Sequence, residues 1–252
     1  FRNLIKYKTQ SLVSIIGLAV GFTCFALSAL WIRYEMTYDN FHEGAERIYL
    51  VRAHYANEPG TSKFTPYPLM KYLQDKMPEI EAVTAFTAHH VKFRMEDTEQ
   101  EIGMIAADSV FMNFFDIQLL KGTVNFLKCD GQEVAITKEF AKRLFSKEED
   151  ALGKEVEVGR RVCKIGAIVS GWSNHSNIPY NILAPARHSP RWGSSNEQLF
   201  IRVRERTDID AFRTKMSTVC INDIEKESEL SDLLITRMSA LRYSDYVDKA
   251  DV

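Results

Sequence analysis

The stretch from Ser11 to Ile32 reads SLVSIIGLAVGFTCFALSALWI, and it contains no charged residue. As a helix that rises about 1.5 Å per residue, these 22 residues would be roughly 33 Å long, enough to cross the hydrocarbon core of a membrane. The run exceeds the roughly 7–15 apolar residues of a signal peptide, and no small-residue cleavage site follows it. Trp31 and Tyr34 lie where an interfacial aromatic anchor belongs. We therefore predict a transmembrane helix over residues 11–33, rather than a cleaved signal peptide.

Charge on either side of this segment predicts its orientation. Basic residues precede the span and acidic residues follow it closely: Arg2, Lys6 and Lys8 on one side, Glu35, Asp39 and Glu43 on the other. The positive-inside rule then places residues 1–10 in the cytoplasm and everything after the span outside it. Apolar and basic side chains interleave in residues 1–10, which favours an amphipathic flank in contact with membrane lipid. A merely polar flank is the alternative.

Small residues recur along one face of the predicted helix, at alternating spacings of three and four: Ser14, Gly17, Gly21, Cys24 and Ser28. Small side chains let a second helix approach closely, and lipid gives helices no hydrophobic reason to associate. We interpret this stripe as a packing surface for a partner helix, although small residues are also simply common in membrane helices.

Composition limits what the rest of the chain can be. The 252 residues include 32 basic and 34 acidic side chains, mixed along the sequence, for a net charge of −2. A nucleic-acid-binding protein needs a basic face, so we predict no nucleic-acid partner. Residues 34–252 are enough for one large domain or two small ones. The sequence starts at Phe1 and stops at Val252 without a closing signal, and we expect a longer protein around it.

Strand and helix patterns alternate through residues 34–252. Strands are predicted at 47–54, 82–87, 91–95, 101–106, 133–136, 154–158, 161–169, 180–184, 199–203 and 233–236. Helices are predicted after Pro68, over 109–115, over 138–145 with Thr137 as the cap, and over 208–226 with Asp208 as the cap. This order predicts an α+β fold: a single membrane helix followed by a mixed domain in two lobes.

Catalytic and cofactor signatures are missing from the sequence. It contains no phosphate-binding loop, no GxGxxG, no HExxH and no GxSxG. His89 and His90 are neighbours on a predicted strand and would point to opposite faces, so we predict no metal site there. The four cysteines lack a zinc-ligand spacing, and a domain of this size does not need a disulfide. We therefore predict that the chain is not an enzyme and holds no cofactor.

At its start the chain resembles the MacB/FtsX-type ABC transporter permeases. The resemblance rests on FRNLIKYKTQSLVSIIGLAVGF and on the segment that follows it, which matches the family pattern Y-E-x-x-Y-D-x-F-H-x-x-A-x-R-I-Y-x-V. The matching residues are Tyr34, Glu35, Tyr38, Asp39, Phe41, His42, Ala45, Arg47, Ile48, Tyr49 and Val51. Further similarity lies in EVAITKEFAKRLFSKEEDALGKEVEV, CKIGAIVSGWSNHSNIPYNIL and NEQLFIRVR.

The resemblance implies a permease subunit of the bacterial inner membrane with a two-lobed periplasmic core domain over residues 34–252. Carried over to this chain, the membrane-proximal lobe covers residues 34–126 and 197–252, and the inserted lobe covers residues 127–196. A separate cytoplasmic subunit would bind ATP and Mg²⁺ and hydrolyse the ATP. A second permease copy or half and a periplasmic adaptor or substrate are the other implied partners. The resemblance also implies a set of stalk and coupling residues: Tyr34, Glu35, Tyr38, Asp39, Phe41, His42, Arg47 and Tyr49. Among them Phe41 and His42, just outside the membrane, are the expected coupling joint.

Two other functions stay open from the sequence. The first is a signal-anchored extracytoplasmic sensor or ligand-binding domain, which would need a ligand pocket. The second is an anchored hydrolase, in which Ser173, His175 and Asp208 would form a triad.

Overall fold

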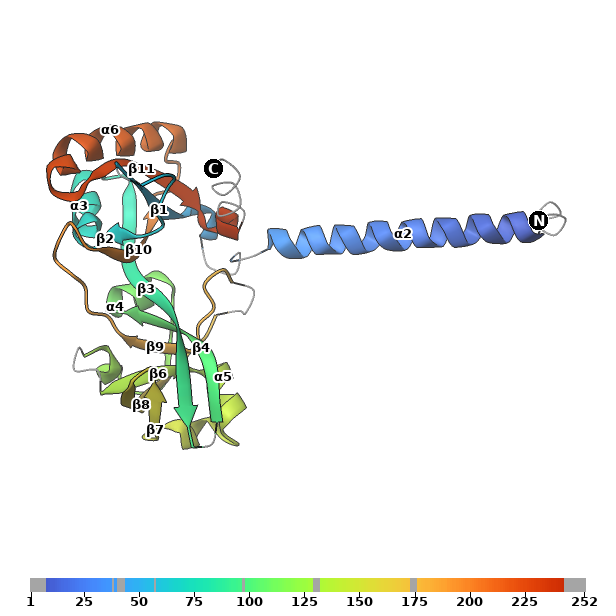
Figure 1. The fold of residues 1–252 in the computed structure, drawn as a ribbon, viewed down its shortest axis with the longest axis horizontal. Helices are drawn as coiled ribbons and strands as arrows, with labels where there is room; N and C mark the ends of the chain where they lie inside the picture. Colours follow the sequence, from blue (N-terminus) through green and yellow to red (C-terminus); the bar gives the residue numbers. More distant parts are fainter. Residues whose placement is uncertain are drawn as a thin grey trace. The chain divides into compact units, whose positions relative to one another are not determined.

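The computed structural model describes residues 8–37, 39, 44–56, 58–96, 98–128, 132–172 and 176–242; of residues 8, 10, 11 and 219–228 it describes the backbone alone. The chain divides into two compact units, Phe1–Tyr38 and Asp39–Val252. The first unit is a helix and the second is a mixed α/β domain (Figure 1).

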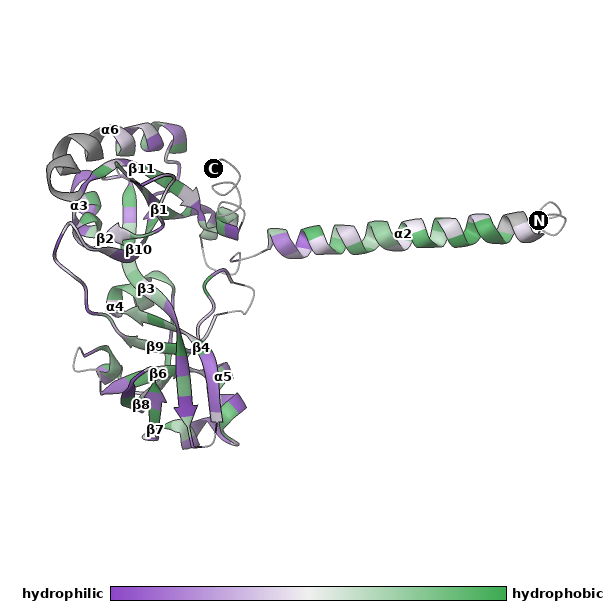
Figure 2. Ribbon diagram, in the orientation of Figure 1, coloured by the Kyte–Doolittle hydropathy of each residue, from purple (hydrophilic) through white to green (hydrophobic). Residues whose placement is uncertain are grey.

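The first unit contains α2, Lys8–Met36, one uninterrupted helix of 29 residues. Its large apolar side chains are exposed, and Figure 2 shows apolar residues along most of its length. A helix that is apolar all round is suited to a lipid surrounding. Over Leu12–Met36 it is long and apolar enough to cross a membrane, and it is the one such helix in the described part of the chain. The predicted single apolar helix is confirmed, with Tyr34 and Glu35 in its last turn.

The second unit contains strands, helices and short 3-10 turns. The strands are β1 (Ile48–Tyr55), β2 (Thr65–Pro66), β3 (Ile80–Met95), β4 (Thr98–Ala107), β5 (Leu119–Gly122), β6 (Glu133–Thr137), β7 (Glu155–Val158), β8 (Arg161–Val169), β9 (Ile182–Pro185), β10 (Ser195–Val203) and β11 (Leu230–Arg237). The helices are α3 (Pro68–Lys76), α4 (Ser109–Phe114), α5 (Lys138–Leu144) and α6 (Ile209–Ser228). The 3-10 turns are η1 (Ala45–Arg47), η2 (Val124–Leu127), η3 (Glu148–Ala151) and η4 (Met238–Ala240).

Local sequence signals set the helix boundaries. The Thr137 hydroxyl accepts a hydrogen bond from the Phe140 backbone N–H at 3.3 Å and so caps α5. The Asp208 carboxylate accepts from two backbone N–H groups of the first turn of α6, both at 3.1 Å. Both caps were predicted, because Thr and Asp satisfy the unpaired N–H groups that begin a helix.

One group of strands runs in the order β11-β1-β10 and continues into the first half of β3, with antiparallel pairing throughout. β1 is buried on both faces from Ile48 to Ala53, as its apolar run Ile48–Val51 favours. One face packs with α3 and α6 around Leu69, Leu73 and Phe212. These residues form one of the three cores of the unit.

β3 joins this group of strands to a second one. Its residues 80–86 pair with β10, and its residues 87–95 pair with β4. The sequence predicted two strands here, 82–87 and 91–95, and that prediction is wrong. The ladder continues unbroken because Ala88, His89 and His90 pair with residues 105, 104 and 103 of β4.

The second group of strands closes on itself as a ring in the order β3-β4-β9-β6-β8-β7 and back to β3. The closing contact is short, with Phe93 paired to Val158 and Arg94 paired to Glu157. An ion pair of 3.2 Å between the Arg94 guanidinium and the Glu157 carboxylate supports this contact. Phe93, Val134, Ile136, Phe140 and Ile165 are among the side chains that fill a core of the ring and α5.

An aromatic core lies between the two groups of strands. Phe86 on β3 and Phe200 on β10 stack at 5.5 Å between ring centres, and Phe111 on α4 meets Phe86 edge-on at 4.9 Å. Trp172 and Tyr180 extend the set, with their rings perpendicular at 4.8 Å. Such edge-to-face pairs contribute stability beyond that of the buried apolar area alone.

The first and the last described elements of the second unit pack together. η1, which precedes β1, contacts η4, which follows β11, and β1 pairs directly with β11. The predicted lobe boundaries at residues 127 and 196 remain a prediction. By strand pairing, the second half of β3, β4 and β5 belong with the strands of residues 133–185, so the second group begins before residue 127.

Candidate functional site

The predicted stalk and coupling residues lie in the family motif, residues 34–51, which begins in the last turn of α2. Tyr34 belongs to the last turn of that helix, and its ring lies 6.4 Å from that of Trp31. Asp39, Arg47 and Tyr49 belong to the second unit. Tyr38, Phe41 and His42 lie outside the described residues.

Asp39 is fully buried, three residues after the end of α2. Its carboxylate accepts a hydrogen bond from the Ser176 hydroxyl at 2.5 Å and from the Asn177 side-chain amide at 2.6 Å. It also accepts from the Asn177 backbone N–H, at 3.1 Å and 3.3 Å to its two oxygens. Both oxygens therefore have donors, which is how a buried carboxylate is stabilised. We call this set, Asp39 with Ser176 and Asn177, the Asp39 latch.

The loop that the latch holds is itself fixed to the aromatic core. The Ser176 hydroxyl also accepts a hydrogen bond from the Ile178 backbone N–H at 3.1 Å. The Trp172 indole N–H donates to the Ile178 carbonyl at 2.9 Å. Tyr180 donates its hydroxyl to the Ser170 carbonyl at 3.1 Å, and burial raises the pKa of that hydroxyl. The residues after α2 are thus tied to the connection between β8 and β9.

Arg47 ties the same segment to the first group of strands. One guanidinium nitrogen lies 2.5 Å from a Glu81 carboxylate oxygen and 3.2 Å from the Val203 carbonyl. These partners stand on β3 and β10, so Arg47 spans two strands. The hydrogen bond with Glu81 is the main cause that raises the pKa of Arg47 above its ordinary value. Gly44 precedes η1 with φ of 69°, a conformation that suits glycine.

Tyr49 is a core residue of β1, 1% exposed. The Arg237 guanidinium of β11 lies 5.9 Å from the centre of its ring, and the two residues are paired across the strands. The role of Tyr49 in the motif is therefore packing, at the place where β1 pairs with β11.

Comparisons with known proteins assign this segment and the fold around it to a family. The model of the MacB-like periplasmic core domain family matches residues 11–219. The chain belongs to this family. A search of curated proteins gives no match.

Solved structures agree with a MacB-like domain. A permease protein domain from Porphyromonas gingivalis has a TM-score of 0.63 at 20% identity, over 78% of this chain and 92% of that one. The extracellular domain of the noncanonic ABC-type transporter YknZ from Gram-positive bacteria has a TM-score of 0.55 at 13% identity, over 75% and 99%. The periplasmic region of MacB from Actinobacillus actinomycetemcomitans has a TM-score of 0.55 at 12% identity, over 80% and 94%. At these identities the likeness shows the fold. With the apolar helix, the family indicates a membrane-anchored protein with an extracytoplasmic domain.

The small-residue stripe of α2 meets nothing in the described part of the chain. A Cβ added at Gly17 or Gly21 has no heavy atom within 4 Å, and Cys24 is exposed. Nothing within the described residues therefore requires small side chains there. The packing role of Ser14, Gly17, Gly21, Cys24 and Ser28 stays a prediction.

The other chemical candidates from the sequence are not assembled into a site. Ser173 and His175 lie outside the described residues, and the Asp208 carboxylate is engaged as the cap of α6. Within the described ranges, no three or more His, Cys, Asp or Glu side chains are grouped as a metal ion would need. Sequence reasoning missed Ser176 and Asn177. The signal that could have found them is their position in CKIGAIVSGWSNHSNIPYNIL, a stretch similar to the family, where they stand in a loop rich in hydrogen-bonding side chains.

Proposed function

We propose that this chain is the permease subunit of an ABC-type transporter, in which the MacB-like domain relays ATP-driven movement of the membrane helices to a periplasmic substrate or partner. The supporting observation is the span of the family match, which begins in the apolar helix at residue 11 and ends in α6 at residue 219. Helix and domain therefore belong to one family unit, as a relay between them requires.

The Asp39 latch supplies the proposed route for the movement. Residues just outside the membrane would move with the end of α2. Because the Asp39 carboxylate is bonded to Ser176 and Asn177, a displacement of this segment pulls on the loop between β8 and β9. Arg47 passes the same displacement to β3 and β10 through Glu81 and the Val203 carbonyl. β3 then continues into the ring of strands.

The position of the end of the unit suits a permease. η4 and β11 lie against η1 and β1, so the last described elements of the domain lie beside its first ones, as a return of the chain to the membrane would need. We propose that residues 1–10 are cytoplasmic, in line with the positive-inside rule, and that the protein resides in the bacterial inner membrane. The proposed partners are an ATP-binding subunit that holds ATP and Mg²⁺, a second permease copy against the stripe of α2, membrane lipid and a periplasmic adaptor or substrate.

Isolation of the tagged protein from its native membranes tests this function. We expect an ATP-binding subunit to copurify. We also expect a non-hydrolysable ATP analogue to change hydrogen exchange in the segment from Ser176 to Tyr180. In the Asp39→Asn variant the subunit should still copurify, whereas the ATP-dependent change should be lost. An isolated protein with no ATP-binding partner, or a wild-type complex in which ATP leaves this segment unchanged, would contradict the proposal.

A further inference from the structure

One end of the strand ring opens into a cavity of about 370 Å³. All six strands of the ring contribute to its wall, and the residues at its edge follow β7 and β9. The lining residues are Thr87, His89, Met104, Ala106, Val134, Val158, Arg160, Arg161, Cys163, Ala184, Pro185 and Arg187. We call this cavity the ring mouth. Its volume is in the range of small-molecule sites, which occur preferentially at places such as the mouths of barrels.

The ring mouth is positively charged at its rim and apolar inside. Its lining includes three arginines and a histidine but no aspartate or glutamate. Met104, Ala106, Val134, Val158 and Ala184 form the apolar interior, and Val134 and Val158 are also part of the ring core.

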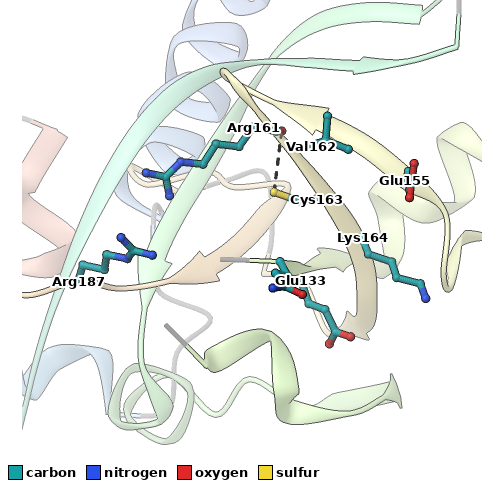
Figure 3. A pocket seen from close by; sticks show the side chains of 8 residues that line it. Glu133, Glu155, Arg161, Val162, Cys163, Lys164 and Arg187 are labelled. Carbon is teal, nitrogen blue, oxygen red and sulfur yellow. Dashed lines mark hydrogen bonds between the residues drawn. The ribbon is translucent and has the colours of Figure 1, made fainter. Parts of the chain in front are cut away.

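Arg160 and Arg161 at the rim differ from Arg94 of β3 in their ion pairing. Arg94 of β3 is paired with both Glu99 and Glu157. Arg160 and Arg161 are exposed, and within the described ranges neither takes part in an ion pair. Two carboxylates, Glu133 and Glu155, line a neighbouring polar hollow. This hollow shares Arg161, Cys163 and Arg187 with the ring mouth. In Figure 3 the Arg161 and Arg187 side chains extend to one side of Cys163, and the two carboxylates lie on the other.

We propose that the ring mouth binds an anionic amphiphile, a carboxylate or phosphate group carried on an apolar chain. The planar guanidinium groups of Arg160 and Arg161 match the oxygens of such a head group, and the apolar chain enters between Met104, Val134 and Ala184. A bare anion gains nothing from the apolar interior, and a cationic amphiphile is repelled at the rim. This site goes beyond the relay proposed above and does not rest on it.

Photo-cross-linking tests the site with the full chain in nanodiscs of zwitterionic lipid. The probe is a dodecanoate that carries a diazirine on its chain, and labelled peptides are mapped by mass spectrometry. We expect label on the peptides that contain residues 87–106, 158–163 and 184–187. Excess dodecanoate and dodecyl phosphate should compete for this label. Dodecyltrimethylammonium and inorganic phosphate should not.

Substitution separates the site from general lipid binding. The double variant Arg160→Gln, Arg161→Gln should lower labelling of these peptides about tenfold, because it removes charge-assisted hydrogen bonds from the head group. Arg213→Gln, which changes an exposed arginine on α6, is the matched control and should label as the wild type does. Equal labelling of the double variant, equal competition by the cationic amphiphile or by inorganic phosphate, or label confined to α2 would each overturn the proposal.

Discussion

Replacement of Asp39 by Asn isolates the hydrogen bonds of the latch from the backbone that carries them. Asp39 has φ of 55°, a left-handed conformation that Asn adopts more readily than other side chains. The two side chains have the same shape, so the substitution leaves the burial unchanged. It converts one acceptor oxygen into a donor nitrogen.

The expected cost follows from the donors that face Asp39. One carboxylate oxygen accepts from the Asn177 side-chain amide at 2.6 Å and from the Asn177 backbone N–H at 3.1 Å. Hydrogen bonds to charged groups contribute about 1.5–3 kcal/mol each, and a buried donor without a partner costs about 1–3 kcal/mol. The Asn177 amide can turn over and restore one contact, whereas the backbone N–H keeps only its longer contact, 3.3 Å, to the other oxygen, which no longer carries a charge. We therefore expect the loop to lose about 2–3 kcal/mol of stability against local opening.

Hydrogen exchange measures that opening directly. The full chain in nanodiscs would be compared with the variant at the amides of Asn177 and Ile178. A loss of 2–3 kcal/mol corresponds to exchange that is about 30- to 150-fold faster. Amides of β1, which pair with β10 and β11, should exchange as in the wild type.

Ser176→Ala is the comparison variant: it removes one donor to Asp39 and the acceptor of the Ile178 backbone N–H, and it leaves the carboxylate bonded to Asn177. It should accelerate exchange at Asn177 less than Asp39→Asn does, because both contacts from Asn177 to the charged carboxylate remain. The double variant should be non-additive, because the two residues share a bond. If Asp39→Asn changes exchange at Asn177 by less than threefold, the latch does not hold the loop and the argument for it fails.

Two further predictions concern stability. Gly122→Ala should lower the free energy of unfolding by at least about 2 kcal/mol, measured by denaturant titration, because φ is +84° and an added Cβ would meet the Gly166 carbonyl oxygen. The control is Gly159→Ala, where φ is +66° but the added Cβ would meet open space, and it should cost about 1 kcal/mol. Equal losses in the two variants would refute the steric argument. The hydrogen bond from Lys215 lowers the pKa of Glu79, so its stabilisation is present at neutral pH and is lost as the pH falls through the folded-state pKa of that carboxyl. Between pH 3 and 7 the free energy of unfolding should therefore vary less in Lys215→Met than in the wild type, by a fraction of a kcal/mol for a pair this exposed. Identical pH profiles of the two proteins would contradict this prediction.

Much of the secondary structure was predictable because its signals are local. Thr137 ends β6 and Asp208 follows a turn, and the side chain of each caps the next helix as predicted. The strands predicted at 154–158 and 161–169 are β7 and β8, and they form a hairpin around Gly159. The helix predicted after Pro68 is α3, and Leu69 and Leu73 on it are buried.

What the sequence did not reveal depends on residues far apart in the chain. β9 pairs in parallel with β4, and β6 pairs in parallel with β8, pairings that no turn sequence can specify. The break predicted inside β3 at residues 88–90 rested on polar character alone, whereas pairing with β4 continues through His89 and His90. Gly103 looked like an ordinary strand residue, yet an added Cβ there would lie 2.4 Å from the Pro179 carbonyl oxygen. Its reason is the close approach of a distant loop.

The latch shows the same limit for function. Asp39 was predicted as a coupling residue from the motif in which it stands, and its partner Asn177 is 138 positions away. A buried carboxylate needs donors, so the sequence could indicate that a partner must exist but not which loop supplies it. Because Ile178 is bonded to Trp172 and packed in the aromatic core, we expect a displacement at Asp39 to reach that core. If the relay operates as proposed, shortening the loop between β8 and β9 should disturb coupling even where Asp39 is intact, and a deletion there that leaves coupling unchanged would place the route through Arg47 and β3 instead.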